Sequence, residues 1–292
     1  MKQLFEHQQH IITEDKKRTG LFLGCGGGKT LTALLLAKGK TIVVAPKTQV
    51  EDKNWEREAE ENGLSIDLTV ISKEVFRKEW NKIPKCDTLI IDEAHTALGV
   101  MPATHYVNKQ EHIKTSQIFT AVHEYIQKHR PERIYPCTAT IAKSAMTVWG
   151  CATILGRTWD FDEFREVYYW RRSIMRAVKI RGKVTRRSVD IWSPKTDKGT
   201  KERLANTVKK LGYTGRLSDW FDVPDQTHKN VYIDLTEEQK SRIKMMKFDY
   251  PEPIVRVGKI HQVENGILSA DEFSPVEYFT NGKTEWLKEH AV

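Results

Sequence analysis

Five short apolar runs, separated by longer helix-like stretches, organise the first 140 residues of the chain. The runs lie at 21–23, 41–45, 66–71, 88–91 and 133–137, and the last four together are rich in β-branched residues. In the clearest helix-like stretch, 114–129, apolar residues recur at helical spacing. Wholly apolar strands separated by helices are typical of a parallel sheet that is buried on both faces. The sequence therefore predicts an α/β fold with a central parallel sheet and helices on both faces.

The segment GLFLGCGGGKT, residues 20–30, joins the first apolar run to the helix-like run LTALLLAKGK, which we expect Gly39 to cap. Small residues before a helix let backbone N–H groups converge on phosphate oxygens. A strict phosphate-binding loop reads G-x-x-x-x-G-K-[ST], and Leu23 stands where its first glycine belongs. The loop alone fits either a nucleotide site with a variant opening or a glycine-rich turn. In a nucleotide site, Lys29 would reach the β- and γ-phosphates, and the Thr30 hydroxyl would bind Mg²⁺.

The string TLIIDEAH, residues 88–95, is an apolar run that ends in two acids. Asp92 at the strand tip is suited to hold Mg²⁺ through its water shell, and Glu93 to orient or deprotonate an attacking water. An isolated Asp-Glu pair is usually a solvated helix start. Its place directly after an apolar strand, 63 residues beyond Lys29 (92 − 29), favours the metal site.

Positive charge is concentrated in one segment. The chain carries a net charge of +8, whereas Arg165 to Arg216 alone holds 16 Lys and Arg against 4 Asp and Glu, a net +12. The string YYWRR interleaves Arg171 and Arg172 with aromatic residues, which suits phosphate contacts and base stacking. The alternative is a solvated, partly disordered insertion whose aromatic residues pack on the core.

Several function classes find no support in the composition. The four cysteines form no C-x-x-C pair, so neither a zinc site nor a disulfide framework is expected, and a reducing, cytoplasmic setting is the simple interpretation. The N-terminus has no apolar signal-peptide region, and no apolar run approaches the ~18 residues of a membrane span. We therefore expect no membrane partner.

Taken together, the glycine loop and the D-E-A-H string resemble the first RecA-like motor domain of a superfamily 2 helicase or translocase. The chain is most similar to the Swi/Snf-like members, especially their short phage relatives. That family often opens its phosphate loop as x-x-x-G-x-G-K-T, so Leu23 is no longer an exception. The resemblance implies ATP and Mg²⁺ as cofactors and Lys29, Asp92 and Glu93 as catalytic residues. It places the nucleotide on Gly26, Gly27, Gly28, Lys29 and Thr30, and Mg²⁺ on Thr30 and Asp92.

Two further strings resemble motifs of this family that flank the nucleotide. LFEHQ (4–8) resembles the glutamine motif, which implies that Gln8 binds adenine, with Gln9 as the fallback. CTATIAKS (137–144) resembles the T-A-T motif that links hydrolysis to movement. It implies that Thr138 and Thr140 hydrogen-bond toward the D-E-A-H strand and that His95 lies on the same coupling surface.

Two strings resemble motifs that grip the nucleic-acid backbone. VVAPKTQVEDKNW (43–55) implies contacts from Lys47 and Thr48, whereas Trp55 is expected to pack in the core. VISKEVFRK (70–78) implies contacts from Ser72 and Lys73, and a surface helix cap is nearly as good an interpretation there.

The domain organisation expected from this resemblance has two parts. Residues 1–230 form a RecA-like ATP-binding domain that includes the basic segment 165–216. Residues 231–292 form a linker and the start of a second RecA-like domain, with VYIDLTEEQK as a crossing strand followed by a helix that Thr236 caps. No Q-x-x-G-R-x-x-R string supplies the arginines of a complete second domain. A truncated chain, a motor split over two chains, and a single-domain binder all remain open.

The function implied is an ATP-dependent DNA translocase or helicase subunit, with duplex DNA as the favoured partner and a possible separate chain as the source of the second RecA-like domain. The alternative is a nucleic-acid-binding module that binds ATP with little turnover of its own. A small-molecule kinase is disfavoured, because the D-E-A-H and T-A-T strings have no role in one.

Overall fold

The computed structural model describes residues 3–107, 110–180, 183–222, 233–249, 253–265, 267–268, 277–278 and 281–290. Two compact units divide the chain, Met1–Val223 and Pro224–Val292. The glycine loop (residues 20–30) and the D-E-A-H residues 92–95, which we call the acid loop, both belong to the first unit.

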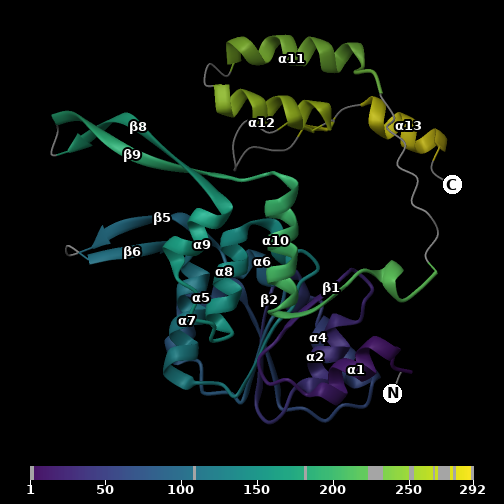
Figure 1. The fold of residues 1–292 in the computed structure, drawn as a ribbon. Helices are drawn as coiled ribbons and strands as arrows, with labels where there is room; N and C mark the ends of the chain where they lie inside the picture. Colours follow the sequence, from purple (N-terminus) through teal and green to yellow (C-terminus); the bar gives the residue numbers. More distant parts are fainter. Residues whose placement is uncertain are drawn as a thin grey trace. The chain divides into compact units, whose positions relative to one another are not determined.

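A parallel sheet forms the centre of the first unit (Figure 1). Four of its strands pair in the order β3 (Leu68–Ser72), β2 (Thr41–Ala45), β4 (Thr88–Ile91) and β7 (Arg133–Pro136). Two parallel bridges, Arg18 to Ile134 and Leu21 to Cys137, link β7 to β1 (Gly20–Leu23). On its other side β1 pairs in parallel with β10 (Gly212–Gly215). Six parallel strands thus run in the order β3-β2-β4-β7-β1-β10.

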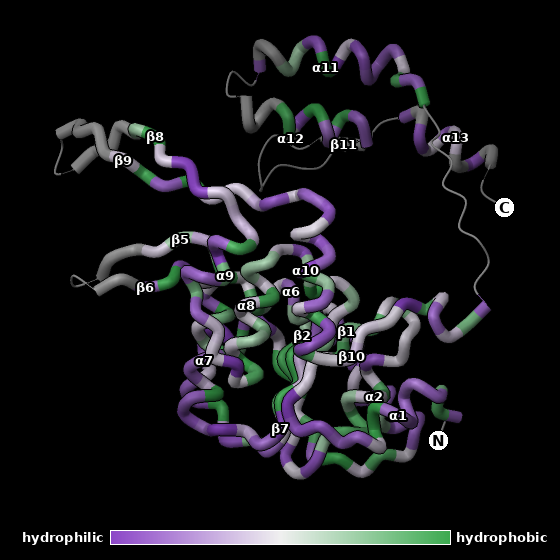
Figure 2. Tube along the Cα trace, in the orientation of Figure 1, coloured by the Kyte–Doolittle hydropathy of each residue, from purple (hydrophilic) through white to green (hydrophobic). Residues whose placement is uncertain are grey.

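Helices cover both faces of this sheet, because successive residues of each buried strand point to opposite sides. Val43 joins one apolar cluster, and its neighbours Ile42 and Val44 join the other. The Val43 side is covered by α1 (Glu6–Glu14), α2 (Lys29–Leu36) and α4 (Asn54–Glu61). The opposite side is covered by α5 (Lys73–Glu79), α7 (Gln117–His129), α8 (Ala145–Ile154) and α9 (Phe161–Tyr168). Hydrophobic residues concentrate along the central strands (Figure 2), and the predicted α/β class is confirmed.

Two helix boundaries differ from the prediction. Helix α7 begins at Gln117 rather than 114, because residues up to Thr115 belong to β6 (Gln110–Thr115); Ser116 Oγ accepts from the Phe119 N–H at 3.2 Å and caps the helix. The expected cap by Gly39 is wrong: α2 ends at Leu36. Gly39 instead makes a left-handed turn (φ +64°) against the Asp87 carboxylate, which accepts from the N–H of Lys40.

Two antiparallel hairpins project from the first unit (Figure 1). One pairs β5 (Val100–Val107) with β6, and the other pairs β8 (Tyr169–Ile180) with β9 (Lys183–Pro194). After the second hairpin, α10 (Lys198–Lys209) leads the chain back to β10 beside β1. The described part of the basic segment is therefore folded into a hairpin, a helix and a strand of the central sheet.

The described part of the second unit contains α11 (Glu237–Asp249), α12 (Pro253–Glu264), β11 (Ile267–Leu268), β12 (Glu277–Tyr278) and α13 (Gly282–His290). Thr236 Oγ1 accepts from the Gln239 N–H at 3.2 Å, so the predicted cap of α11 is confirmed. The predicted crossing strand is not found over 233–235, and its residues 231–232 lie outside the described residues. None of the helices described here has the length and apolar character needed to cross a membrane.

Short connecting elements complete the loops at the carboxyl ends of the strands. Helix α3 (Lys47–Glu51) follows β2, and α6 (Ala94–Ala97) follows β4. Because all six strands are parallel, their carboxyl ends meet at one edge of the sheet, where ligands bind in open α/β sheets.

Candidate functional site

The glycine loop leaves β1 at this edge and enters α2. Gly28 precedes the helix with φ +72°, and Gly26 has φ +76°, both in the left-handed region that favours glycine. Lys29 lies across the loop, and its Nζ donates to the carbonyls of Leu23 at 3.0 Å and Gly24 at 3.1 Å. Thr30, partly exposed, follows in the first turn of α2. The loop therefore combines a cation and a hydroxyl with the start of a helix.

Gln8 is the glutamine that touches this loop. Its side chain is buried; Oε1 accepts from the Phe5 N–H at 3.0 Å, and Nε2 donates to Gly28 O at 3.3 Å and Thr32 Oγ1 at 3.2 Å. Gln9 is exposed and donates to the carbonyl of Leu4 instead. The geometry therefore favours Gln8 over the fallback.

A cavity of about 360 Å³ lies beside Gln8 and the glycine loop. Gly26, Gly28, Lys29 and Thr30 line it together with Gln8 and Phe5. Lys29 is the only cation among the described residues that line it.

Aromatic residues from a distant segment cover the glycine loop, which we did not predict from the sequence. Trp220, shortly after β10, stacks on the His7 ring at 3.8 Å, and His7 Nε2 lies 3.1 Å from the carbonyl oxygen of Gly27. A Cβ built on Gly27 would lie 3.3 Å from the Trp220 ring. Only the pairing of β10 with β1 brings residues 217–221 to the loop, and the four-residue strand GYTG carries too little pattern to predict that pairing.

The acid loop follows β4 at the same edge. Asp92 Oδ1 accepts from the Glu93 N–H at 2.9 Å, and Oδ2 accepts from Trp55 Nε1 at 3.4 Å. Burial is the main cause that raises the pKa of the Asp92 carboxyl. Trp55 is 1% exposed, as expected for a core residue.

Glu93 adopts a left-handed conformation (φ 42°) that is uncommon outside glycine. Its carbonyl accepts from three donors: Lys73 Nζ at 3.0 Å, the Thr96 N–H at 3.0 Å and Thr96 Oγ1 at 2.9 Å. Such a conformation persists where the surroundings over-determine it, and these three donors do so here.

The two residues after β3 have partners inside the first unit. Ser72 Oγ accepts from the Val75 N–H at 3.2 Å and caps α5, which agrees with the helix-cap interpretation. Lys73 Nζ donates to Thr96 Oγ1 at 2.6 Å as well as to the Glu93 carbonyl. Burial lowers the pKa of Lys73 to about 8, against the opposing pull of Asp92 and Glu93. The structure thus joins Lys73 to the acid loop.

A hydrogen-bonded cluster links the acid loop to the loop after β7. His95 Nδ1 lies 2.8 Å from Thr138 Oγ1 and 3.2 Å from Glu93 Oε2, and Thr138 Oγ1 donates to Glu93 Oε2 at 3.3 Å. Thr140 joins only through its backbone N–H, which donates to Thr138 Oγ1 at 3.2 Å; its side chain is exposed. Of the two threonines, Thr138 therefore makes the side-chain contact expected of the T-A-T string.

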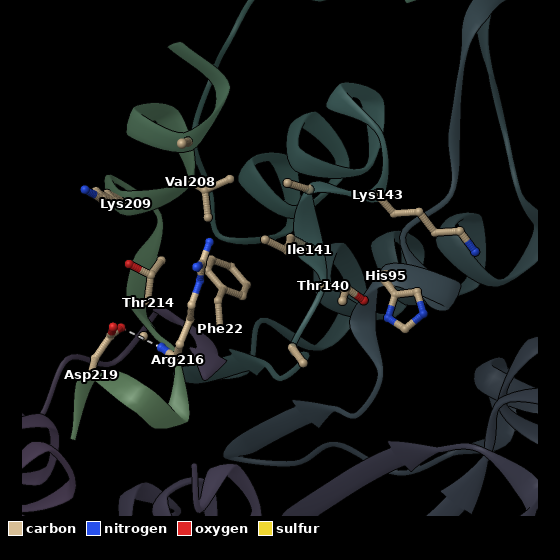
Figure 3. Close-up of a pocket in the computed structure, with 14 residues that line it drawn as sticks. Phe22, His95, Thr140, Ile141, Lys143, Val208, Lys209, Thr214, Arg216 and Asp219 are labelled. Atoms are coloured by element: carbon tan, nitrogen blue, oxygen red, sulfur yellow. Dashed lines mark hydrogen bonds between the residues drawn. The ribbon is translucent and has the colours of Figure 1, made fainter. Parts of the chain in front are cut away.

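Another cavity, of about 970 Å³, borders this cluster (Figure 3). Phe22, Ile141 and Val208 line it, with His95 and Thr140 on one side. It shares no lining residue with the cavity beside Gln8. The nucleotide-loop residues gather at the smaller cavity, so we place the candidate nucleotide site there.

The remaining residues that the sequence predicts to contact nucleic acid are three cations, Lys47, Arg171 and Arg172, and the threonine that follows Lys47. Lys47 and Thr48 begin α3, and Lys47 is 70% exposed with its Nζ 3.4 Å from Glu51. Arg171 and Arg172 lie on β8, where Arg171 pairs with Asp190 at 2.9 Å and Arg172 is exposed. The hairpin arginines take no part in either cavity.

No group of three or more His, Cys, Asp and Glu side chains is arranged to hold a metal ion within the described part of the chain. One carboxylate, Asp92, and one hydroxyl, Thr30, suit Mg²⁺, which keeps several waters and takes further ligands from substrate phosphates. The donor set therefore fits a metal that arrives with a nucleotide.

Comparisons with known proteins give likenesses to solved structures. No family model and no curated protein matches the chain. The chain is similar to a solved structure of the Hef helicase domain from Pyrococcus furiosus, with 16% sequence identity and a TM-score of 0.38. The likeness covers 58% of this chain and 41% of that one.

Proposed function

We propose that this chain is the first motor domain of an ATP-dependent DNA translocase or helicase of the Swi/Snf-like type. Residues 1–230 form the ATP-binding domain, and 231–292 form the linker and the start of a second domain. The observation that carries the proposal is that a glycine loop held by Gln8 and an acid loop bonded to Thr138 both follow parallel strands at one edge of the sheet. These are the parts that nucleotide hydrolysis coupled to movement requires.

Each residue of the site has a task in this proposal. Lys29, which donates to two loop carbonyls, is the cation that would turn to the β- and γ-phosphates. Asp92 and Thr30 would hold Mg²⁺, which neutralises phosphate charge. Glu93 would orient or deprotonate the attacking water. Its contacts with His95 and Thr138 would link hydrolysis at Glu93 to a movement of the loop after β7.

The nucleotide cavity also needs positive charge from a second domain. Lys29 alone among the described lining residues brings positive charge to the nucleotide cavity. An arginine supplied from a second domain is worth ~10³–10⁵ in rate in phosphoryl-transfer enzymes. We therefore propose that turnover requires a second RecA-like domain, whether it belongs to a longer chain or to a separate one.

Nucleotide binding and turnover test the proposal separately. Lys29→Ala removes a charge-assisted contact and should weaken Mg-ATP binding by about 10- to 100-fold in calorimetry. Glu93→Gln should retain binding and lower turnover by about 10²–10⁴-fold. Lys82→Ala, a 73% exposed lysine outside the site, is the matched control.

Turnover is to be measured with and without duplex DNA, and with a second-domain chain added. Stimulation by DNA that both site variants abolish supports the motor. Equal ATP affinity of Lys29→Ala and the wild type would contradict the nucleotide site itself. Tight ATP binding with background turnover under every condition would leave only the nucleic-acid-binding module.

A further inference from the structure

We propose that one face of the β8–β9 hairpin binds an unpaired nucleic-acid strand, with a base stacked on Trp170 and a phosphate held by Arg172. We call this the outward face, and it comprises Trp170, Arg172 and Ile174 of β8 with Val189, Ile191 and Ser193 of β9. The inference rests on the proposed nucleic-acid function and adds to it both the surface and the form of the ligand.

The strand register separates two faces that the sequence leaves mixed. In an antiparallel pair, directly opposite residues share a face and consecutive residues alternate between faces. Trp170 lies opposite Ser193 and Arg172 opposite Ile191, so these four share the outward face. Arg171 lies opposite Trp192 on the other face. The two consecutive arginines of YYWRR therefore point in opposite directions.

Part of the inward face, around Tyr169 and Trp192, is already occupied by the protein, whereas Arg171 on the same face is 59% exposed. Tyr169 is buried, and Trp192 packs against the core with the Arg165 guanidinium 4.0 Å from its ring centre. Asp190 accepts from Ser173 Oγ at 2.6 Å and pairs with Arg171 at 2.9 Å. The charge of Arg171 is thus balanced by a neighbouring carboxylate.

The outward face has the opposite character. Trp170 is 64% exposed, and Ile191 is 42% exposed. Lys195 Nζ lies 4.5 Å from the centre of the Trp170 ring and donates to the Glu166 carbonyl at 2.6 Å, which fixes a cation beside the indole. Arg172 is exposed, and its side chain makes no ion pair with any residue of the described chain. An exposed aromatic ring and an unbalanced guanidinium therefore lie on one face.

An exposed aromatic ring beside a guanidinium that is unpaired among the described residues favours a nucleic-acid strand as the ligand. A nucleobase stacks on an aromatic ring only when it has left its own duplex stack, so the ligand is an unpaired strand. The guanidinium suits the phosphate that follows each base, and the net charge of +12 across residues 165–216 (16 − 4) attracts a polyanion. An apolar protein partner would suit Trp170 and Ile191 but would leave this charge unbalanced.

The test measures binding of the full chain to a fluorescent single-stranded oligonucleotide and to the corresponding duplex, without nucleotide, across a salt series. Trp170→Ala should weaken single-strand binding by about 5- to 150-fold. Arg172→Ala should weaken it and also reduce the salt slope by about 0.7. Trp170→Phe keeps a stacking ring and should restore most of the affinity.

The matched control is the double variant Arg171→Gln/Asp190→Asn, which removes the inward ion pair without changing net charge. It should bind the single strand within about twofold of the wild type, as expected for an exposed ion pair outside the interface. Thermal unfolding verifies that each variant is folded.

The proposal is overturned if Trp170→Ala binds the single strand as tightly as the wild type, or if it loses affinity equally for single strand and duplex. Capture of an apolar protein segment by the outward face, with no effect on oligonucleotide binding, would also overturn it. ATP turnover does not enter this measurement. A chain that binds the strand through Trp170 but never hydrolyses ATP would refute the motor and leave this surface standing.

Discussion

Gly28 occupies a position where both backbone and neighbours exclude a side chain. Its φ of +72° disfavours other residues, and a Cβ there would lie 2.4 Å from Gln8 Nε2. We expect Gly28→Ala to displace Gln8 and to weaken Mg-ATP binding, with a loss of about 2–4 kcal/mol of unfolding free energy.

Gly63 provides the control for backbone strain alone. It has a similar φ of +65°, but no atom lies within 4 Å of a Cβ built there. Gly63→Ala should cost about 1–2 kcal/mol and leave ATP affinity unchanged. Thermal unfolding and calorimetry measure both quantities, and equal effects of the two substitutions on ATP affinity would refute a role for the Gly28–Gln8 contact.

Lys73 makes the free energy of unfolding depend on pH in the alkaline range. Its pKa of about 8 in the folded protein lies below the ordinary value of 10.5. Between these values the unfolded chain binds more protons than the folded one, so the free energy of unfolding contributed by Lys73 rises with pH. We expect the wild type to gain on the order of 1–3 kcal/mol relative to Lys73→Met between pH 8 and pH 10.5.

Denaturant unfolding of both proteins across this range measures the difference, and groups common to both cancel. A difference that stays constant with pH would show that Lys73 keeps its ordinary pKa. A falling difference would mean that its charged form is the one that folding favours.

At the scale of elements, apolar pattern predicted the buried strands because burial on both faces leaves a continuous apolar run. Strands β2 and β4 match their predicted bounds, and the acids and threonines after β4 and β7 meet because parallel strands share an edge. The two hairpins carry no comparable signal, since β8 mixes arginines with apolar residues on a largely exposed pair. Arg171 and Arg172 point in opposite directions because consecutive residues of a strand alternate between faces, whereas the residue opposite each arginine depends on the register of the hairpin.

An ion pair joins the end of α1 to the start of β7. Arg133, 4% exposed, donates from Nη1 to Asp15 Oδ1 at 2.7 Å and from Nη2 to Oδ2 at 2.9 Å. Asp15 is 40% exposed, so solvent screens part of the interaction. Asp15→Ala should still cost about 1–3 kcal/mol of unfolding free energy, because it leaves a buried guanidinium without its carboxylate.

We also expect the contribution of this ion pair to the free energy of unfolding to depend on pH in the acid range. Hydrogen bonds from Arg133, then Lys38, hold the pKa of the Asp15 carboxyl well below its usual range. Its contribution is therefore full above about pH 4 and is lost as the pH falls further. Lys38→Ala, which removes only the exposed partner at 2.8 Å, should cost less than about 1 kcal/mol. Comparable losses of unfolding free energy for Lys38→Ala and Asp15→Ala would contradict the conclusion that Arg133 is the main partner of Asp15.

At the scale of the whole molecule, every residue of the candidate nucleotide site lies within Met1–Val223. The residues that cover the glycine loop, His7 and Trp220, come from opposite ends of this unit. Because β10 pairs with β1 and residues 217–221 follow directly, the unit must extend past Trp220 to complete the loop. We therefore expect binding of a nucleotide and assembly of a complete motor to be separable.

We accordingly expect a fragment that ends at Val223 to fold cooperatively and to bind Mg-ATP as tightly as the full chain, because it retains the central sheet and both apolar clusters. Cys25, exposed in the glycine loop, reports binding, whereas burial of Cys86, Cys137 and Cys151 raises the pKa of each thiol and makes them poor nucleophiles. Mg-ATP should slow alkylation of Cys25 in both proteins, as followed by intact mass spectrometry. A fragment ending at Arg216 keeps β10 but lacks Trp220, and it should lose this protection. Loss of protection already in the longer fragment would mean that residues beyond Val223 contribute to the nucleotide site.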